Sequence, residues 1–289
     1  MAMSHAPLAS LVLALVMAPA TGWADDPRPP APAPAPPVSA PGAKSGKDPA
    51  PPPPRAATDA EAKALVDGLA AVARKKAPDV LAALSALEGL RHVEFVKPLV
   101  KLLTHEDDGV AIGAARQLEI QRPAGPDDKL VAKEVERVGR DVWRNGFQHP
   151  TNKGRPVVRG AIVKVAGAWS ITLDAKQFDE VKSLWAREMG NPDPRRSDAL
   201  LHVIAYVEAT RDKRFCRMLA EQIEQPVAGN VNDAANPSAA YWEARWRLWE
   251  KIGDPAIDVL KALTGQTFAT TADAKAWFQA NVKTFKFDW

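Results

Sequence analysis

The sequence predicts an all-α fold, in the form of a short, irregular α-solenoid of stacked antiparallel helix pairs. From Asp59 onward, apolar residues recur every three or four positions, as in Val80, Leu84 and Leu87, which is the period of an α-helix rather than of a strand. Signals for helix starts return roughly every 40 residues along the chain. Helix pairs of that length cannot bury their apolar faces alone, so we expect them to stack on one another.

Residues 1–24 are predicted to be a cleaved export signal. Positions 8–18 form an apolar run shorter than the ~20 residues of a membrane-spanning helix, and small residues, Gly22 and Ala24, precede Asp25 at the positions that a signal peptidase reads. The stretch before the apolar run has no Lys or Arg, so retention as an uncleaved anchor is the alternative. The predicted location is the periplasm or the exterior of the cell.

Residues 25–58 are predicted to be a disordered linker rich in proline and alanine. Thirteen of the chain's 26 prolines lie between positions 27 and 54, in runs such as P-A-P-A-P-A-P-P and P-P-P-P. Proline fixes φ and lacks an amide donor, which favours the extended polyproline II conformation. The segment is expected to act as a spacer, and the alternative is a ligand for a proline-binding domain.

Residues 59–289 are predicted to form the folded domain, in about five helix pairs. Several helices are expected to begin at a polar residue that an apolar residue follows six or seven positions later. These predicted starts are His92, Asp128, Asp174, Asp212 and Asp254. The stretch G-R-P-V-V-R-G-A-I-V-K-V, at 154–165, is rich in β-branched residues, but its apolar positions keep the helical spacing and predict a helix.

A helix boundary is predicted in the stretch K-I-G-D-P, at 251–255. Gly253 can end one helix in the left-handed conformation, while Asp254 and Pro255 suit the first positions of the next helix. One helix is therefore expected to end and another to begin here without a loop.

A terminal cap is predicted at 264–289. Gly265 is expected to end the preceding helix, with Phe268 folding back against the helix end. Thr270 or Thr271 is expected to cap the last helix, which covers the end of the stack with one apolar face. That face consists of Ala274, Trp277, Phe278 and Val282.

Two stretches resemble HEAT repeats. V-E-F-V-K-P-L-V-K-L-L-T-H-E-D-D-G-V-A-I-G-A-A-R-Q-L, at 93–118, is similar to one repeat, and W-E-K-I-G-D-P-A-I-D-V-L-K-A-L, at 249–263, is similar to the junction between repeats in HEAT-like, armadillo-type proteins. Ala111 departs from the pattern, because the family commonly has an arginine there. The resemblance, to exported bacterial proteins of this type, implies a curved stack of helix pairs that binds other proteins.

The sequence contains no clustered catalytic, metal-binding or phosphate-binding motif. H-E-x-x-H, G-x-S-x-G, G-x-x-x-x-G-K and C-x-x-C are absent, and no two of the five histidines lie three or four residues apart. His202 is predicted to be a hydrogen-bonded core histidine, and Cys216, the only cysteine, a buried small hydrophobe. We therefore expect no cofactor and no enzyme activity. The alternative is an enzyme whose catalytic groups lie far apart in the sequence.

The most unusual charge feature is the interval 142–173, which contains no carboxylate. Its glycines and prolines predict a loop that leads into a helix, on which Arg155 and Arg159 follow one turn apart. Together with Arg144 and Lys153 they are candidate contacts for an anionic ligand or an acidic partner. The alternative is a solvated loop between repeats.

A stripe of tryptophans is the second candidate surface. Tyr241 precedes Trp242, Trp246 and Trp249, which share one face of a predicted helix. Indoles in a row can stack on sugars, but a helix also needs such a stripe to pack against its neighbour, and the sequence favours that second interpretation.

These observations predict a non-catalytic scaffold that binds a protein partner in the cell envelope. The alternative is a module that binds an anion or a glycan through residues 144–164 or 242–249. From Asp59 onward the chain carries 34 Lys and Arg against 32 Asp and Glu, a balance that does not indicate nucleic acid as a partner. No stable membrane span is expected once the signal is removed.

Overall fold

The computed structural model describes residues 53–124, 132–191, 193, 196–223, 226 and 237–285 of the 289-residue chain. All of them belong to one compact unit, Pro51–Trp289. The predicted signal at 1–24 and most of the predicted linker at 25–58 lie outside the described residues, as does the predicted helix start at Asp128. The described part is mostly helical, which confirms the all-α prediction.

The helices follow one another with short connections. They are α1 (Asp59–Val72), α2 (Ala77–Ser85), α3 (Val96–Leu102), α4 (Asp108–Ile120), α5 (Ala132–Val142), α6 (Pro156–Ala168), α7 (Ala175–Gly190), α8 (Ser197–Thr210), α9 (Phe215–Gln222), α10 (Ala239–Thr264) and α11 (Thr271–Asn281). Single helical turns are η1 (Val93–Phe95), η2 (Trp143–Phe147) and η3 (Pro150–Asn152).

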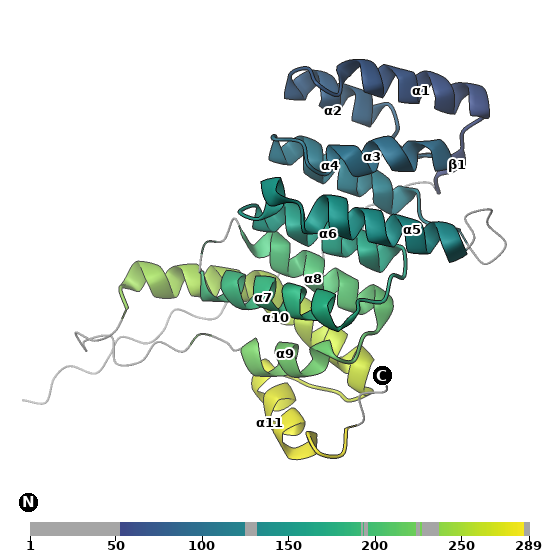
Figure 1. Ribbon diagram of the computed structural model, residues 1–289. Helices are drawn as coiled ribbons and strands as arrows, with labels where there is room; N and C mark the ends of the chain where they lie inside the picture. The colour runs from purple at the N-terminus through teal and green to yellow at the C-terminus, as the bar shows by residue number, and fades with distance from the viewer. Residues whose placement is uncertain are drawn as a thin grey trace, which may run out of the picture. The chain divides into compact units, whose positions relative to one another are not determined.

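The helices pack as successive pairs in two rows. Each odd-numbered helix from α1 to α9 contacts the even-numbered helix that follows it, and α2, α4, α6, α8 and α10 also contact one another in that order. Figure 1 shows the pairs one below another, from α1 to the terminal helix α11. The apolar positions that keep helical spacing in the sequence, such as Val80, Leu99 and Val181, face the buried space between the rows.

The tightest packing joins α6 to α8. A Cβ atom on Gly160 would lie 2.7 Å from the Cα atom of Ala199, and one on Gly167 would lie 2.9 Å from the Cα atom of Tyr206. The two glycines are seven residues apart on α6, as are their neighbours on α8, so the helices touch backbone to backbone at two levels. The helix predicted at 154–165 is thereby confirmed, and its glycines are what let it lie this close to α8.

Several predicted helix ends are confirmed. Asp174 caps α7 by accepting a hydrogen bond from the backbone N–H of Gln177, and Thr270 caps α11 in the same way through Asp273. Gly265 ends α10 in the left-handed conformation, with φ of 70°. Local chemistry is sufficient to place these ends.

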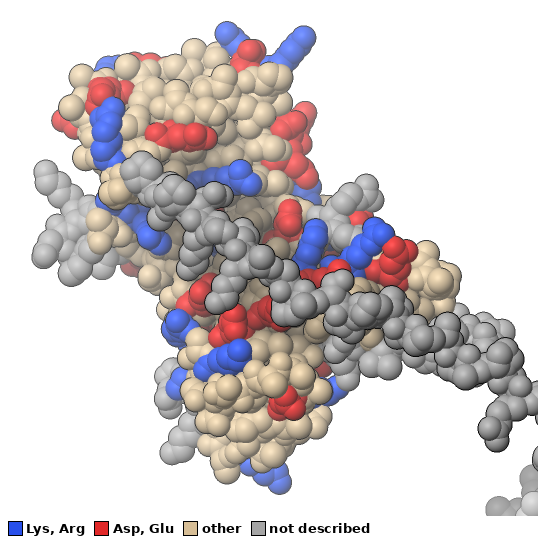
Figure 2. Space-filling model, turned by 180° about the vertical axis from the view of Figure 1, so that it is seen from behind, with Lys and Arg blue, Asp and Glu red and all other residues tan. Residues whose placement is uncertain are grey.

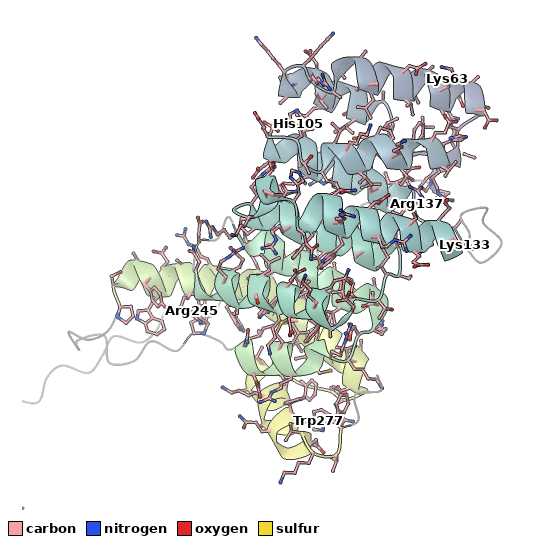
Figure 3. The ribbon with its side chains drawn as sticks, viewed as in Figure 1. Lys63, His105, Lys133, Arg137, Arg245 and Trp277 are labelled. Atoms are coloured by element: carbon pink, nitrogen blue, oxygen red, sulfur yellow. The ribbon has the colours of Figure 1, made fainter. Side chains whose placement is uncertain are left out.

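Several features predicted for the segment 264–289 are also confirmed, although residues 286–289 lie outside the described part. Phe268, Ala274 and Phe278 are buried, and the ring of Trp277 lies 5.9 Å from that of Phe268. Trp277 is labelled in Figure 3. Val282 is the exception, because it follows the end of α11 and is 39% exposed. The predicted apolar face is therefore one residue too long.

The predicted boundary at 251–255 is wrong. α10 runs without interruption from Ala239 to Thr264, with Pro255 in its interior, and Gly253 is not left-handed. Ile252, Ala256 and Ile257, on either side of the proline, are all buried. Burial of this continuous apolar face opposes the cost of the proline, which is about 3 kcal/mol for a lost hydrogen bond and a steric clash.

A small parallel ladder adds the described part's only strands. Residues Arg55–Ala56 form β1 and pair with Leu90–Arg91, which form β2. The next residue, Ala57, is buried, so Arg55–Ala57, within the predicted linker, belong to the fold together with the residues from Asp59 onward. No strand was expected, because two-residue ladders leave no periodic pattern in a sequence.

Candidate functional site

The carboxylate-free segment is folded into helical turns rather than an open loop. η2 and η3 occupy its first half, and α6 begins at Pro156. Asn152, which the sequence presents as a polar loop residue, is fully buried and donates hydrogen bonds of 2.9 Å to the carbonyl oxygens of Leu103 and Gly146. The segment is therefore tied to the α3 end of the preceding pair.

Arg155 is a structural residue and not a free cation. Its Nε donates to a carboxylate oxygen of Asp108 at 2.6 Å, and its Nη1 donates to the carbonyl oxygen of His105 at 2.7 Å and to Oδ1 of Asn152 at 2.9 Å. The side chain is only 13% exposed. Arg155 thus holds the start of α6 against the turn between α3 and α4, and the predicted joint anion clamp of Arg155 with Arg159 does not form.

The other two predicted residues lie apart from this cluster. Arg144, on η2, and Lys153, after η3, are exposed, and their side chains form no hydrogen bond or ion pair with another described residue. Neither one lines a pocket with Arg159. They are consistent with a solvated surface, on which lone cations contribute little.

Arg159 is the predicted residue that stands out. Its guanidinium lies over the ring of Phe147, with 3.9 Å from Cζ to the ring centroid. Its Nε is buried, and the guanidinium has no hydrogen-bond or ion-pair partner among the described residues. Burial lowers the pKa of Arg159, and the charge of Arg187 lowers it further, while Glu180 and Glu188 oppose that shift.

A pocket of about 500 Å³ lies beside this guanidinium, between α6 and α7. Apart from Arg159 and Leu184, its lining consists of polar residues on one face of α7: Lys176, Asp179, Glu180, Ser183 and Arg187. None of these α7 residues was predicted from the sequence. The sequence shows that these residues share one face of a helix. Charged residues at that spacing also occur on any solvent-exposed helix face, so the pattern alone did not indicate a binding site.

Fixed contacts hold the walls of the pocket. Glu180 accepts hydrogen bonds from Nε1 of Trp143 at 2.9 Å and from Nε2 of Gln148 at 2.8 Å. The fully buried Glu188 pairs with Nε of Arg187 at 2.9 Å and with Nη1 of Arg196 at 3.4 Å. Two of the carboxylates near Arg159 are therefore already engaged by other residues.

The aromatic face of α10, which we define as Tyr241, Trp242, Trp246 and Trp249, is not a core stripe. Trp246 is 38% exposed, and the other three are half-buried. The indoles of Trp246 and Trp249 lie 5.4 Å apart, and Arg245 lies over the ring of Tyr241. Figures 1 and 3 show the start of α10, where Arg245 is labelled, extending beyond the ends of the neighbouring helices. The core-packing interpretation is therefore wrong for Trp246.

Cys216 and the potential metal ligands of the described residues give no sign of a further site. Cys216 is buried as predicted, and burial raises the pKa of its thiol to about 12. Within the described ranges, no group of three or more His, Cys, Asp and Glu side chains is placed to hold a metal ion.

His202 differs from its prediction, because its Nδ1 is buried without a hydrogen-bond partner among the described residues. Burial lowers its pKa to about 4, helped by Lys164 and Arg116 and opposed by Asp198. The unfolded chain therefore binds a proton between pH 6.5 and 4 that the folded chain does not, so His202 lowers stability as the pH falls through that range.

We expect the protein to lose about 2 kcal/mol more stability from pH 7 to pH 5 than a His202→Leu variant. Urea unfolding at the two pH values measures this difference, and parallel loss in both proteins would contradict it.

No known protein family, no curated protein and no solved structure matches this chain. In the described part of the chain, no helix is both long enough and apolar enough to cross a membrane. The function must therefore be argued from the geometry of the chain itself.

Proposed function

We propose that this protein is an exported, HEAT-like α-solenoid that acts as a non-catalytic scaffold by binding a protein partner in the cell envelope. The packing of the even-numbered helices into one continuous row, each with an odd-numbered helix beside it, supports a solenoid. The helix pairs predicted from the period of about 40 residues correspond in number to the pairs that α1 to α10 form in the structure. The predicted signal at 1–24 supports export.

The observation that carries the proposal is the exposed Trp246 among half-buried aromatic residues at the projecting start of α10. Tryptophan, tyrosine and arginine dominate binding energy at protein interfaces, because they bury a large area and still offer polar contacts. Trp246 combines an exposed indole with an Nε1 that donates to Glu250 at 2.8 Å, so its ring is held in place before a partner arrives. Preorganisation of this kind reduces the entropic cost of binding.

The charge distribution supports a protein partner rather than a polyanion. Figure 2 shows basic and acidic side chains interspersed on one face of the molecule, without a broad area of one sign. An extended nucleic-acid surface requires clustered cations. The balanced surface instead suits docking by shape and aromatic contact.

A photo-crosslinking amino acid placed at position 246 tests the proposal in the organism that expresses the chain. We expect one dominant covalent adduct with an envelope protein, because the aromatic face contacts the partner. The matched control carries the same amino acid at Glu208, an exposed position on α8 outside the aromatic face. Absence of an adduct at 246, or equal adducts at both positions, would contradict the proposal.

Glycan binding by the same aromatic face is a second candidate, favoured by the exposure of Trp246. Isolated cell-wall polysaccharide distinguishes the two functions. If it retains the purified protein but not the Trp246→Ala variant, and no protein adduct forms at position 246, the surface binds sugar rather than a protein partner.

A further inference from the structure

We propose that the pocket beside Arg159 binds a single carboxylate group, as carried by an acidic side chain or the C-terminus of a peptide or by a small organic acid. The proposal does not depend on the aromatic face, which lies on a different helix. The proposal rests on the guanidinium of Arg159, which is partly buried and has no hydrogen-bond or ion-pair partner among the described residues.

The contacts of Arg159 leave its hydrogen-bond donors unused. Stacking on Phe147 occupies one face of the guanidinium plane, whereas the N–H groups point outward within that plane. Nε is removed from solvent and finds no replacement acceptor among the described residues. An unsatisfied buried donor costs about 1–3 kcal/mol, and more when it is charged, so Nε is a cost to the fold. Nη1 and Nη2 are not among the atoms removed from solvent, and they can donate to a ligand in the pocket.

Arg155, also at the start of α6, shows what a partnered arginine looks like in this part of the fold. It lies one turn earlier, and its guanidinium is held by Asp108, His105 and Asn152. Arg155 therefore stabilises the fold, whereas Arg159 has no equivalent partners in the described part of the chain. The pocket of about 500 Å³ lies where such partners would be, and it has room for a small acid.

The lining of the pocket selects the charge of the ligand. The ammonium group of Lys176 has no hydrogen-bond or ion-pair partner among the described residues, so it is a second cation available to a ligand. Arg187 is a third cation in the lining, but it already pairs with Glu188. Asp179 and Glu180 also line the pocket, and they repel a doubly charged anion more than a singly charged one. A carboxylate matches the planar fork of a guanidinium and carries only one charge, so it fits better than phosphate.

The Nε–H signals of the arginines in a ¹H–¹⁵N spectrum of the full chain provide the test. Acetate and N-acetylglycine are titrated against sodium chloride of equal ionic strength, with inorganic phosphate as the competing anion. We expect a saturable shift of the Arg159 signal with both carboxylates and a smaller one with phosphate. If no signal saturates, if all exposed arginines shift alike, or if phosphate acts as strongly as acetate, the proposal is wrong.

Four variants locate the effect. Arg159→Gln should lose about tenfold or more in affinity, measured on the backbone signals of the pocket face of α7. Arg159→Lys should recover only part of this loss, because an ammonium lacks the bidentate fork. Arg144→Gln removes an exposed arginine outside the pocket and should bind as the parent does. Trp246→Ala should also bind normally, so failure of the scaffold proposal and failure of this one are separate results.

Discussion

Replacing Gly160 with leucine is expected to destabilise the fold by about 3 kcal/mol, the upper end of the range for overpacked cores. At this position the Cα atom of Ala199 would lie 2.7 Å from a new Cβ atom and the carbonyl oxygen of Ala199 would lie 2.9 Å from it. Both contacts involve backbone atoms, which cannot turn aside as the end of a side chain can. The leucine must push α6 away from α8, at the centre of the row of even-numbered helices.

Thermal unfolding measures this effect, with an expected fall in Tm of roughly 6–12 °C. Gly68→Ala is the matched control, because Gly68 also lies within a helix but has no atom within 4 Å of the position that an added methyl group would take. That change should stabilise the protein by about 0.5–1 kcal/mol through helix propensity alone. A Gly160→Leu variant as stable as the parent would show that α6 and α8 are not packed backbone to backbone.

Replacing Asn152 with alanine is expected to cost about 3 kcal/mol. The change removes the donors to the carbonyl oxygens of Leu103 and Gly146 and the acceptor for Nη1 of Arg155, all in a site where Asn152 is fully buried. Each buried polar group that loses its partner costs about 1–3 kcal/mol. The loss should appear as a lower urea midpoint with an unchanged slope.

Asn145→Ala is the matched control for this prediction. Asn145 is an exposed asparagine in the same segment, so its replacement should change stability by less than about 0.5 kcal/mol. Similar losses for the two variants would contradict the structural role of Asn152. They would restore the interpretation of the segment as a loop whose polar groups face solvent.

Local signals predicted the helical content and several helix ends correctly. Asp174 and Thr270 cap helices through hydrogen bonds to residues three positions away, and Gly265 ends one through its own backbone conformation. These interactions depend on neighbours within one turn, so they can be recognised without knowledge of the fold. The boundary expected at Gly253 failed, because the burial of Ile252 and Ala256 favours one continuous helix.

For the candidate site, the sequence and the structure differ more than they do for the helices. The sequence placed Arg155 and Arg159 in one cationic group, and their positions one turn apart do not distinguish them. Asp108, 47 residues before Arg155, engages the first, while α7 provides the second with a pocket instead of a partner. Such partners come from distant segments, and no local pattern reports them.

The sequence by itself therefore determined that this domain is helical, where some of its helices begin or end, and which charged and aromatic residues were candidates for a binding surface. Only the tertiary structure decided that Arg155 pairs with Asp108, that the buried Nε of Arg159 has no partner among the described residues, and that Trp246 faces solvent. The physical reason is the distance along the sequence over which each interaction acts. Helix formation and capping act between residues about four positions apart, whereas the desolvation and pairing of a side chain depend on whichever helices pack around it.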